Sequence, residues 1–153
     1  MPIVNVRPVE RRDYDQWLPL WTGYNTFYKR VAPDDVTATT WGRFFDHYEP
    51  VHALVADAGD SGLVGLVHYI FHRNTGMIGP TTYLQDLFTK TDARGLGVGG
   101  SLIEGVYDAA RSAGSPRVYW MTHETNNQAM LLYDKIAERS GFVQYRHAIT
   151  SRD

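Results

Sequence analysis

Four glycines crowd into eight residues at Ala93-Arg94-Gly95-Leu96-Gly97-Val98-Gly99-Gly100, between an expected strand, Tyr83 to Thr89, and an amphipathic stretch expected to be a helix. Clustered glycines let the backbone take positive φ angles and let successive N–H groups converge on one point. Those N–H groups and the positive end of a helix dipole form a site for an anion such as a pyrophosphate. The segment therefore predicts a phosphate-binding turn that leads into a helix.

Three phosphate-binding patterns compete for this segment. The P-loop requires a lysine before its Ser or Thr, and Gly99-Gly100-Ser101 has none. Gly95, Gly97 and Gly100 satisfy G-x-G-x-x-G by letter, but a dinucleotide-binding fold needs alternating parallel strands and helices around that motif. Here an antiparallel pattern precedes the segment, and the remaining chain is too short for a second nucleotide-binding half. The third pattern, Arg94-Gly95-x-Gly97-x-Gly99, needs a strand before it and a strand and helix after it, and this chain has both.

The chain on both sides of the glycine segment indicates an α+β fold. Before the segment, helical periodicity over Asp13 to Lys29 is followed by apolar strands joined by glycine turns, which is typical of an antiparallel meander. After it, strands and helices alternate. Pro19 is expected to kink or split the first helix. The expected strands are Ile3 to Arg7, Val51 to Ala56, Leu63 to His72, a short one near Met77, Tyr83 to Thr89, Arg117 to Thr122 and Phe142 to Ile149, and the later helices are expected around Trp41 to Tyr48, from Val98 to Ala113 and from Ala129 to Ala137.

Composition limits the class of protein. The chain has 153 residues, of which 43% are hydrophobic, and a formal net charge of -2; this fits a single globular domain over residues 1–153. The absence of cysteine excludes a disulfide framework, a Cys-ligated zinc site and a thiol nucleophile. The lack of a basic excess argues against nucleic-acid binding, and no apolar run approaches the length of a membrane span. The first residues have no signal-peptide pattern, so a cytoplasmic protein is expected.

Residues 83–146 resemble the acetyl-CoA-binding core of the GCN5-related N-acetyltransferases, the GNAT superfamily. Arg94, Gly97 and Gly99 match its R/Q-x-x-G-x-G/A motif. Within the superfamily, the block Trp120 to Asn126 is similar to the yeast histone/polyamine acetyltransferase-like subgroup. The resemblance to that subgroup continues at Tyr133 and Gly141-Phe142. Tyr83 to Thr89 resembles the corresponding strand of spermidine/spermine acetyltransferases. The resemblance implies a mixed, mostly antiparallel sheet with a splayed central parallel strand pair and helices on both faces.

The same resemblance implies where acetyl-CoA, the cosubstrate, binds. The pantetheine arm enters the split between residues 83–89 and 117–122 like an added strand, and an N–H there, that of Phe88, polarises the thioester carbonyl. The glycine segment holds the pyrophosphate, Asn126 contacts the pantetheine, and Tyr133 lies against the sulfur. The implied cofactor-binding residues are Leu87, Phe88, Thr89, Arg94, Gly95, Leu96, Gly97, Val98, Gly99, Gly100, Asn126 and Tyr133.

Direct attack by a primary amine requires a neutral amine, a proton acceptor and an acid for the departing thiolate. Tyr133 is the candidate acid, because a phenol with a pKa of about 10 stays protonated at neutral pH; the alternative is a core aromatic. Asp86, within an apolar strand, and Glu124, at the end of the next strand, are candidate bases through water, or attract a cationic substrate. The alternatives are that Asp86 is ion-paired with a neighbour and that Glu124 caps the following helix.

The acceptor pocket is expected beside the first helix, because the first helices form its wall in the family. Its expected substrate-binding residues are Trp21, Tyr24, Tyr28, Asp86 and Glu124. The two carboxylates favour a small cationic amine, such as a polyamine or a basic amino acid, with no nucleic acid and no membrane as partner. No metal is expected, since His68 and His72 would stand about 13 Å apart on a strand. The family resemblance implies a homodimer.

Other functions remain open at this level. The glycine segment and its context would also suit a non-catalytic module that senses acyl-CoA, and the acceptor could be a protein lysine. The G-x-G-x-x-G letters leave a nicotinamide-dependent reductase as a further alternative. Direct transfer without a covalent enzyme intermediate is favoured, because the chain has neither a cysteine nor a G-x-S-x-G serine motif.

Overall fold

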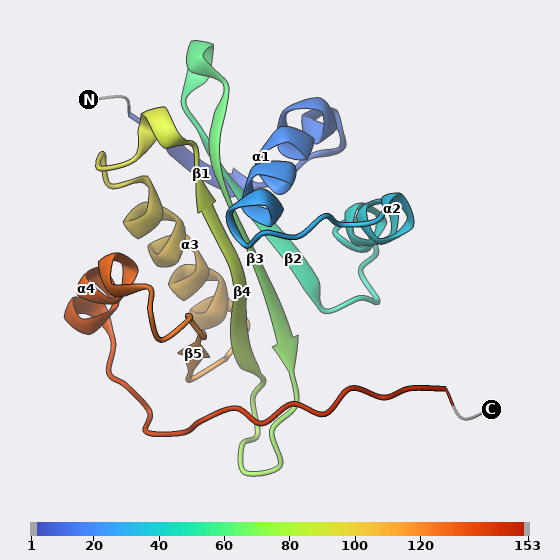
Figure 1. Ribbon diagram of the computed structural model, residues 1–153, viewed down its shortest axis with the longest axis vertical. Coiled ribbons are helices and arrows are strands. Elements are labelled where there is room, and N and C mark those ends of the chain that lie inside the picture. Colours follow the sequence, from blue (N-terminus) through green and yellow to red (C-terminus); the bar gives the residue numbers. More distant parts are fainter. Residues whose placement is uncertain (1–2, 152–153) are drawn as a thin grey trace. The chain divides into compact units, whose positions relative to one another are not determined.

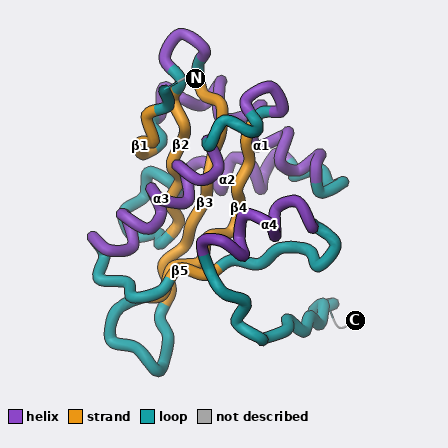
Figure 2. The backbone as a smooth tube through the Cα atoms, turned by 90° about the vertical axis from the view of Figure 1, so that its left-hand side faces the viewer, coloured by secondary structure: helices purple, strands orange, loops and turns teal. Residues whose placement is uncertain are grey.

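A computed structural model describes residues 3–151. The chain forms two compact units, one ending at Trp120 and the other beginning at Met121. The first unit contains a five-stranded sheet in the order β1-β2-β3-β4-β5 (Figures 1 and 2). Its strands are β1 Asn5–Pro8, β2 Val51–Asp57, β3 Leu63–His72, β4 Thr81–Thr89 and β5 Val118–Tyr119. The first four strands form an antiparallel meander, and β5 is parallel to β4. The expected α+β class and mixed sheet are confirmed.

The parallel pair separates soon after it begins. β5 pairs with β4 only through Thr82 with Val118 and Tyr83 with Tyr119. From Leu84 onward, no strand among residues 3–151 pairs with this edge of β4, while the other edge stays paired with β3 up to Thr89. The splayed strand pair implied by the resemblance is therefore present, and it leaves a row of backbone polar groups open.

Helices cover both faces of the sheet, as Figure 1 shows. One face carries α1 Tyr14–Phe27 and α2 Asp34–Arg43, and the other carries α3 Val98–Ser112. α1 lies so close to β4 that a Cβ on Gly23 would come within 2.7 Å of the Phe88 ring. On the opposite face, a Cβ on Gly65 would meet Val98 and Leu102 of α3. Both glycines are therefore required by close packing.

The core between α1 and the sheet is aromatic. Trp17 and Leu20 are fully buried, and Trp41 and Phe44 pack against them from the α2 side. Burying such large side chains is the main force that holds the helix against the strands. It also explains why Pro19 does not split α1: the helix stays continuous, because its aromatic face is buried on both sides of the proline.

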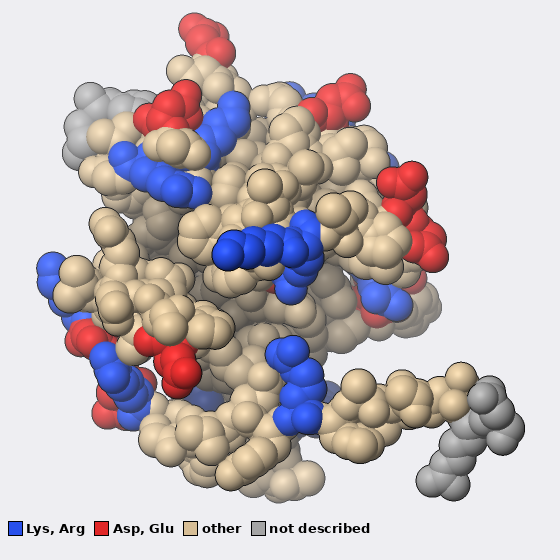
Figure 3. Space-filling model, in the orientation of Figure 1, with Lys and Arg blue, Asp and Glu red and all other residues tan. Residues whose placement is uncertain are grey.

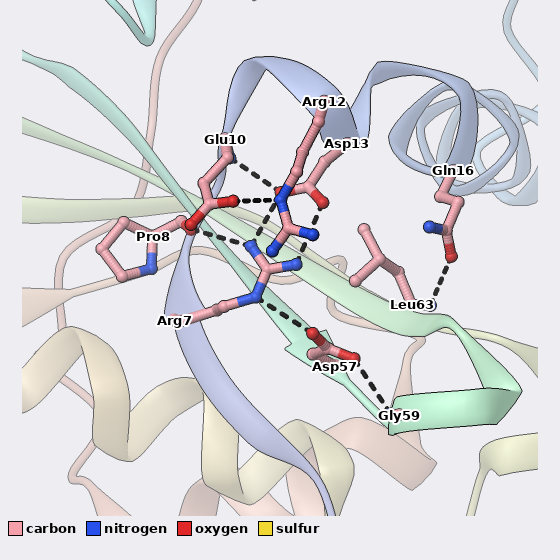
Figure 4. Close-up of polar contacts among 9 residues, drawn as sticks. All are labelled: Arg7, Pro8, Glu10, Arg12, Asp13, Gln16, Asp57, Gly59 and Leu63. Atoms are coloured by element: carbon pink, nitrogen blue, oxygen red, sulfur yellow. Dashed lines mark hydrogen bonds and ion pairs between the residues drawn. The ribbon is translucent and has the colours of Figure 1, made fainter.

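Arg7 on β1 joins the start of α1 to β2 (Figure 4). Its two Nη atoms lie 2.8 and 3.0 Å from the carboxylate oxygens of Asp13, and its Nε atom lies 3.1 Å from Asp57 Oδ2. The Asp13 carboxylate also accepts the Glu10 backbone N–H at 2.7 Å. These hydrogen bonds lower the pKa of Asp13, which is 2% exposed, and raise that of Arg7. The bidentate pair fixes where the first helix begins.

Some expected elements differ in extent. The second helix ends at Arg43 and does not run on toward Pro50, and β5 covers two residues of the expected Arg117 to Thr122. The short strand near Met77 is wrong, because residues 73–80 form turns with Ile78 fully exposed. A strand needs a partner, and no strand between residues 3 and 151 pairs with this segment.

The second unit contains α4, Asn127–Ile136, as expected from its apolar spacing. The expected last strand, Phe142 to Ile149, is wrong: residues 138–151 have no regular structure. Phe142 is 91% exposed and Tyr145 93% exposed, so neither buries the apolar surface that favours strand pairing. Within residues 3–151, no helix is both long and apolar enough to cross a membrane.

Candidate active site

The glycine segment forms the expected turn into α3. Gly95 has a φ of 78° and Gly97 a φ of 81°, and Gly97 is the N-cap residue of the helix. The first bond within the helix is donated by Ser101 to the Gly97 carbonyl at 3.0 Å, so the preceding N–H groups have no acceptor in the helix. No side chain among residues 3–151 caps this end. A Cβ at Gly95, Gly97, Gly99 or Gly100 would meet no atom within 4 Å.

These features fit an anion. The uncapped N–H groups lie at the positive end of α3, and the glycines leave the approach to them open. Basic side chains lie over the turn between β4 and α3 in Figure 3, and the exposed Lys90 and Arg94 belong to that turn. Arg94 Nε donates to the Thr89 carbonyl at 3.1 Å, and its guanidinium stacks on Phe27 and Phe88. The turn is thus shaped and charged for phosphate groups.

The open edge of β4 exposes particular N–H groups. Lys90 donates its backbone N–H to the Val64 carbonyl of β3 at 2.8 Å. Because successive residues of a strand point their N–H groups to opposite edges, Phe88 also points its N–H toward β3. Leu87 and Thr89 then point theirs toward the edge that β5 leaves unpaired. The donor expected at Phe88 is therefore wrong, and its neighbours on either side have the suitable direction.

Asp86 is buried and paired. Its Oδ2 atom lies 2.9 Å from Nδ1 of His68, and the residues are 6% and 2% exposed. The Trp17 indole N–H donates to Nε2 of the same imidazole at 3.1 Å. Since an indole nitrogen only donates, Nε2 carries no proton, and Nδ1 donates its proton to Asp86. The alternative interpretation, in which Asp86 is paired with a neighbour, therefore matches the structure.

A β-bulge turns Asp86 toward α1. His68 lies opposite Asp86, and the next residue, Tyr69, lies opposite Leu84, so Gln85 is an extra residue on β4. Paired residues point to the same face of a sheet, and neighbours on β3 point to opposite faces. Leu84 and Asp86 therefore face opposite sides although they are two residues apart. The bulge places the carboxylate on the α1 face, where His68 and Tyr24 hydrogen-bond to it.

The charge of Asp86 acts on three tyrosines. Burial, the charge of Asp86 and a hydrogen bond to it raise the pKa of Tyr24. Burial and the same charge raise the pKa of Tyr28 and of Tyr83. Tyr24 is 6% exposed and Tyr28 is 42% exposed, so the cluster reaches solvent at Tyr28. These tyrosines and Asp86 form one polar cluster on the α1 face, and the raised pKa values keep the three tyrosines protonated at neutral pH.

Trp21 has a structural role in the same helix. Its indole N–H donates to Thr37 Oγ1 at 3.0 Å, which links α1 to α2. Its ring stacks on Tyr24 with centroids 5.7 Å apart. Trp21 is therefore a support for Tyr24, and its polar atom is already occupied.

The two histidines of β3 have separate partners. Nε2 of His72 is hydrogen-bonded to Tyr119 Oη at 2.7 Å. This contact lies four residues along β3 from the pair of His68 and Asp86. Among residues 3–151, no three His, Asp or Glu side chains gather as metal ligands would. His68, for which the sequence analysis weighed and set aside a metal-binding role, is the partner of Asp86.

The remaining expected site residues lie in the second unit. Glu124 is exposed in a turn before α4 and ends no strand, because β5 stops at Tyr119. Glu124 does not cap α4 either: the N-cap residue is Asn126, whose side-chain amide donates to Thr122 Oγ1 at 3.4 Å. Tyr133 is half-buried on α4, on the same face as Ala129. The catalytic and binding roles of Glu124, Asn126 and Tyr133 stay predictions.

Known proteins resemble this chain both in sequence and in fold. The Acetyltransferase (GNAT) family matches residues 14–137. The D-amino-acid N-acetyltransferase HPA3 of Saccharomyces cerevisiae is 37% identical over 142 residues, which cover 92% of this chain and 88% of that protein. Ribosomal-protein-alanine N-acetyltransferase from Brucella melitensis biovar Abortus 2308 superposes with a TM-score of 0.80 at 21% identity, covering 96% of this chain and 100% of that one. A probable acetyltransferase superposes with a TM-score of 0.83 at 19% identity, covering 97% and 99% of the two chains. By its sequence and its fold, the chain is an acetyltransferase enzyme that belongs to the GNAT family.

Proposed function

We propose that this enzyme transfers the acetyl group of acetyl-CoA directly to the primary amine of a small molecule. The observation that carries the proposal is the arrangement along β4. The strand has an open backbone edge at Leu87 and Thr89, a buried carboxylate at Asp86 and, at its end, the open glycine turn that begins α3. A donor site and an acceptor site would thus adjoin on one strand.

The donor would bind along the open edge and the turn. Arg94 to Gly100 would hold the pyrophosphate through the uncapped N–H groups of α3. The N–H groups of Leu87 and Thr89 would pair with the pantetheine as an added strand does, and one of them would polarise the thioester carbonyl. The family resemblance adds Asn126 at the pantetheine and Tyr133 at the sulfur.

The chemistry consists of one bond formed and one bond broken. An alkylammonium has a pKa of about 10.4, so it must lose a proton before its nitrogen can attack. Asp86, held by His68, would receive that proton through water, with Glu124 as the other candidate. The C–N bond forms and the C–S bond breaks. The leaving sulfur takes a proton from Tyr133, and the nitrogen gives up its second proton, through water, to restore the Tyr133 phenol. Both protons thereby pass through residues of this chain.

The acceptor is proposed to be an amino acid or a related small cationic amine. The negative charge of Asp86 favours a cationic group in the pocket of Tyr24 and Tyr28. The relative HPA3 carries the name D-amino-acid N-acetyltransferase, which supports an amino acid over a polyamine. The expected homodimer stays a prediction, which sedimentation of the full chain can test.

A CoA-release assay at saturating acetyl-CoA tests the proposal. The panel contains both enantiomers of several amino acids, polyamines, aminoglycosides and lysine peptides. Turnover of amino acids or small amines above the rate of acetyl-CoA hydrolysis is expected. Tight CoA binding without turnover of any amine would indicate the acyl-CoA sensor instead, and turnover confined to lysine peptides would indicate a protein acetyltransferase.

A further inference from the structure

Arg30 is a fixed guanidinium over the rings of Tyr24 and Tyr28. Its Nε atom donates to Asn25 Oδ1 at 2.9 Å, and its guanidinium carbon lies 5.2 Å from the Tyr24 ring centroid and 5.6 Å from that of Tyr28. Asn25 is itself fixed: it is 4% exposed, and its amide donates to the Trp21 carbonyl at 2.8 Å. Figure 3 shows basic side chains over the end of α1 on this face.

The backbone accepts strain to place Arg30 there. α1 ends in a Schellman motif, in which Lys29 donates to the Thr26 carbonyl at 2.9 Å and Arg30 to the Asn25 carbonyl at 3.0 Å. Lys29 occupies the left-handed position of this motif, with a φ of 56°, and is the only non-glycine residue between 3 and 151 with a positive φ. Glycine is the usual residue there, since a Cβ atom strains the left-handed conformation. The turn folds the chain back so that Arg30 covers the two tyrosines.

The charge of Arg30 has no carboxylate partner within the described chain. No ion pair between residues 3 and 151 includes Arg30. Only its Nε atom is engaged by a side chain, which leaves the terminal nitrogens for a ligand. A guanidinium in this state matches a carboxylate, which it binds with two parallel hydrogen bonds.

Two opposite charges act on the same pair of tyrosines. The negative charge of Asp86 raises the pKa values of Tyr24 and Tyr28, and the positive charge of Arg30 lowers both. Asp86 is buried, whereas Arg30 is exposed, and both charges act on these two tyrosines. A buried negative charge and an exposed positive charge on one cluster are complementary to a zwitterion, with the ammonium inward and the carboxylate outward.

We infer that Arg30 binds the α-carboxylate of an amino acid whose amino group points toward Asp86, and so selects amino acids over amines that lack a carboxylate. The inference rests on the proposed function for its reaction, but the binding it describes does not require turnover. It makes Arg30 a specificity-determining residue rather than a catalytic one.

The test uses matched ligands that differ by the carboxylate alone: phenylalanine, in each enantiomer, with 2-phenylethylamine, and lysine with cadaverine. Calorimetric binding to the full chain saturated with CoA is measured for wild type and for Arg30→Gln. The variant is expected to weaken binding of the preferred amino acid about 10- to 100-fold, the usual scale for a lost charged hydrogen bond. Binding of the decarboxylated amine should change less than about twofold, because that ligand never contacts the guanidinium.

Arg11→Gln is the control, because Arg11 also stacks on an aromatic ring, Phe45 at 4.6 Å, but does not act on the tyrosines of the pocket. It should leave both ligands unaffected. Equal weakening of both members of a pair by Arg30→Gln, no weakening, or no binding of either amino acid by wild type overturns the inference. Carboxylate-selective binding that depends on Arg30, without acetyl transfer to any ligand, would support the inference and refute the proposed function.

Discussion

The imidazole of His68 holds the carboxylate of Asp86 from one side only, because its other nitrogen is occupied by the indole N–H of Trp17. A second proton on His68 would place two N–H donors face to face in a buried site. In this arrangement Nδ1 donates its proton to Asp86, and Nε2 accepts the proton of Trp17. Asp86 thus directs its negative charge at Tyr24 and Tyr28.

Asp86→Asn removes the negative charge of this side chain but keeps its size and its hydrogen bond to His68. The amide oxygen can still accept the proton of His68 Nδ1, so the free energy of unfolding should change by only about 1 kcal/mol. The negative charge is lost, and kcat for the preferred amine should fall about 100-fold, the scale of a lost general base. Steady-state kinetics and urea unfolding measure the two effects.

His68→Leu should give the opposite balance. It removes the partner of Asp86 and of Trp17 together and leaves two buried polar groups without hydrogen bonds. A loss of about 2–5 kcal/mol in unfolding free energy is expected. A stable His68→Leu protein, or an Asp86→Asn protein with normal kcat, would remove this pair from the mechanism.

Acid should weaken the Arg7–Asp13 pair. The folded state lowers the pKa of Asp13, chiefly through hydrogen bonds from Arg7. The stability that this pair contributes is therefore fully present above the ordinary carboxyl pKa of about 3.9, and is lost as the pH falls through the lower folded value. Asp13→Asn should reduce the unfolding free energy at pH 7 by about 3 kcal/mol and flatten its decline below pH 4.

The exposed pair of Asp134 and Arg139 is the control for this experiment. It has the same bidentate geometry, with distances of 3.2 and 3.0 Å, but both side chains are largely open to solvent. Asp134→Asn should leave the unfolding curve unchanged, because water screens an exposed pair. Equal effects of the two substitutions would show that burial does not strengthen the Arg7–Asp13 pair.

The sequence predicts the parts of the fold that depend on local pattern. The helix after Gly97 has apolar residues at strict helical spacing, and the strands β2 and β3 are apolar runs separated by a glycine turn; all three lie where expected. The expected last strand is absent from residues 138–151, because a strand also depends on contacts that are not local. Alternation can suit a strand over Phe142 to Ile149, but pairing depends on another edge, which local pattern does not contain.

The sequence singled out Asp86 of the candidate site but did not predict the contacts that this residue makes. Asp86 stood out as a carboxylate within an apolar strand, yet its partner His68 depends on the register of two strands. The bulge at Gln85, which turns Asp86 toward α1, leaves no glycine or proline signal. A polar residue within each of two adjacent apolar strands was the available sign of the pair. Arg30 had no sign at all, because the left-handed turn before it is made by a lysine.

Gly97→Val tests the phosphate-binding turn. A valine side chain would enter the space through which a phosphate approaches the first N–H groups of α3, so CoA affinity should fall at least about tenfold. The positive φ of 81° adds backbone strain, which lowers stability by about 1–3 kcal/mol. Calorimetry with CoA and thermal unfolding separate the two effects.

Gly59→Val is the matched control for the glycine experiment. Gly59 has a φ of 67°, and a Cβ added there, as at Gly97, would meet no atom within 4 Å. The strain is therefore comparable, but Gly59 lies in the turn between β2 and β3, away from α3. It should lose stability and keep CoA affinity. Unchanged CoA affinity in a folded Gly97→Val protein would contradict the proposed donor site.

Tyr133→Phe tests the proposed acid. Phenylalanine keeps the ring on the half-buried face of α4 and removes the one proton that the side chain can give. Folding and CoA affinity should change little, whereas the chemical step should slow about 100-fold or more, the scale of a lost general acid. The loss should appear in kcat with little change in KM, since the proton is transferred in the transition state. Tyr145→Phe, at a residue that is 93% exposed in the same unit, should behave as wild type. Single-turnover kinetics show whether chemistry limits the rate, and under that condition a Tyr133→Phe enzyme within about threefold of wild type would exclude Tyr133 as the acid and leave water to protonate the sulfur.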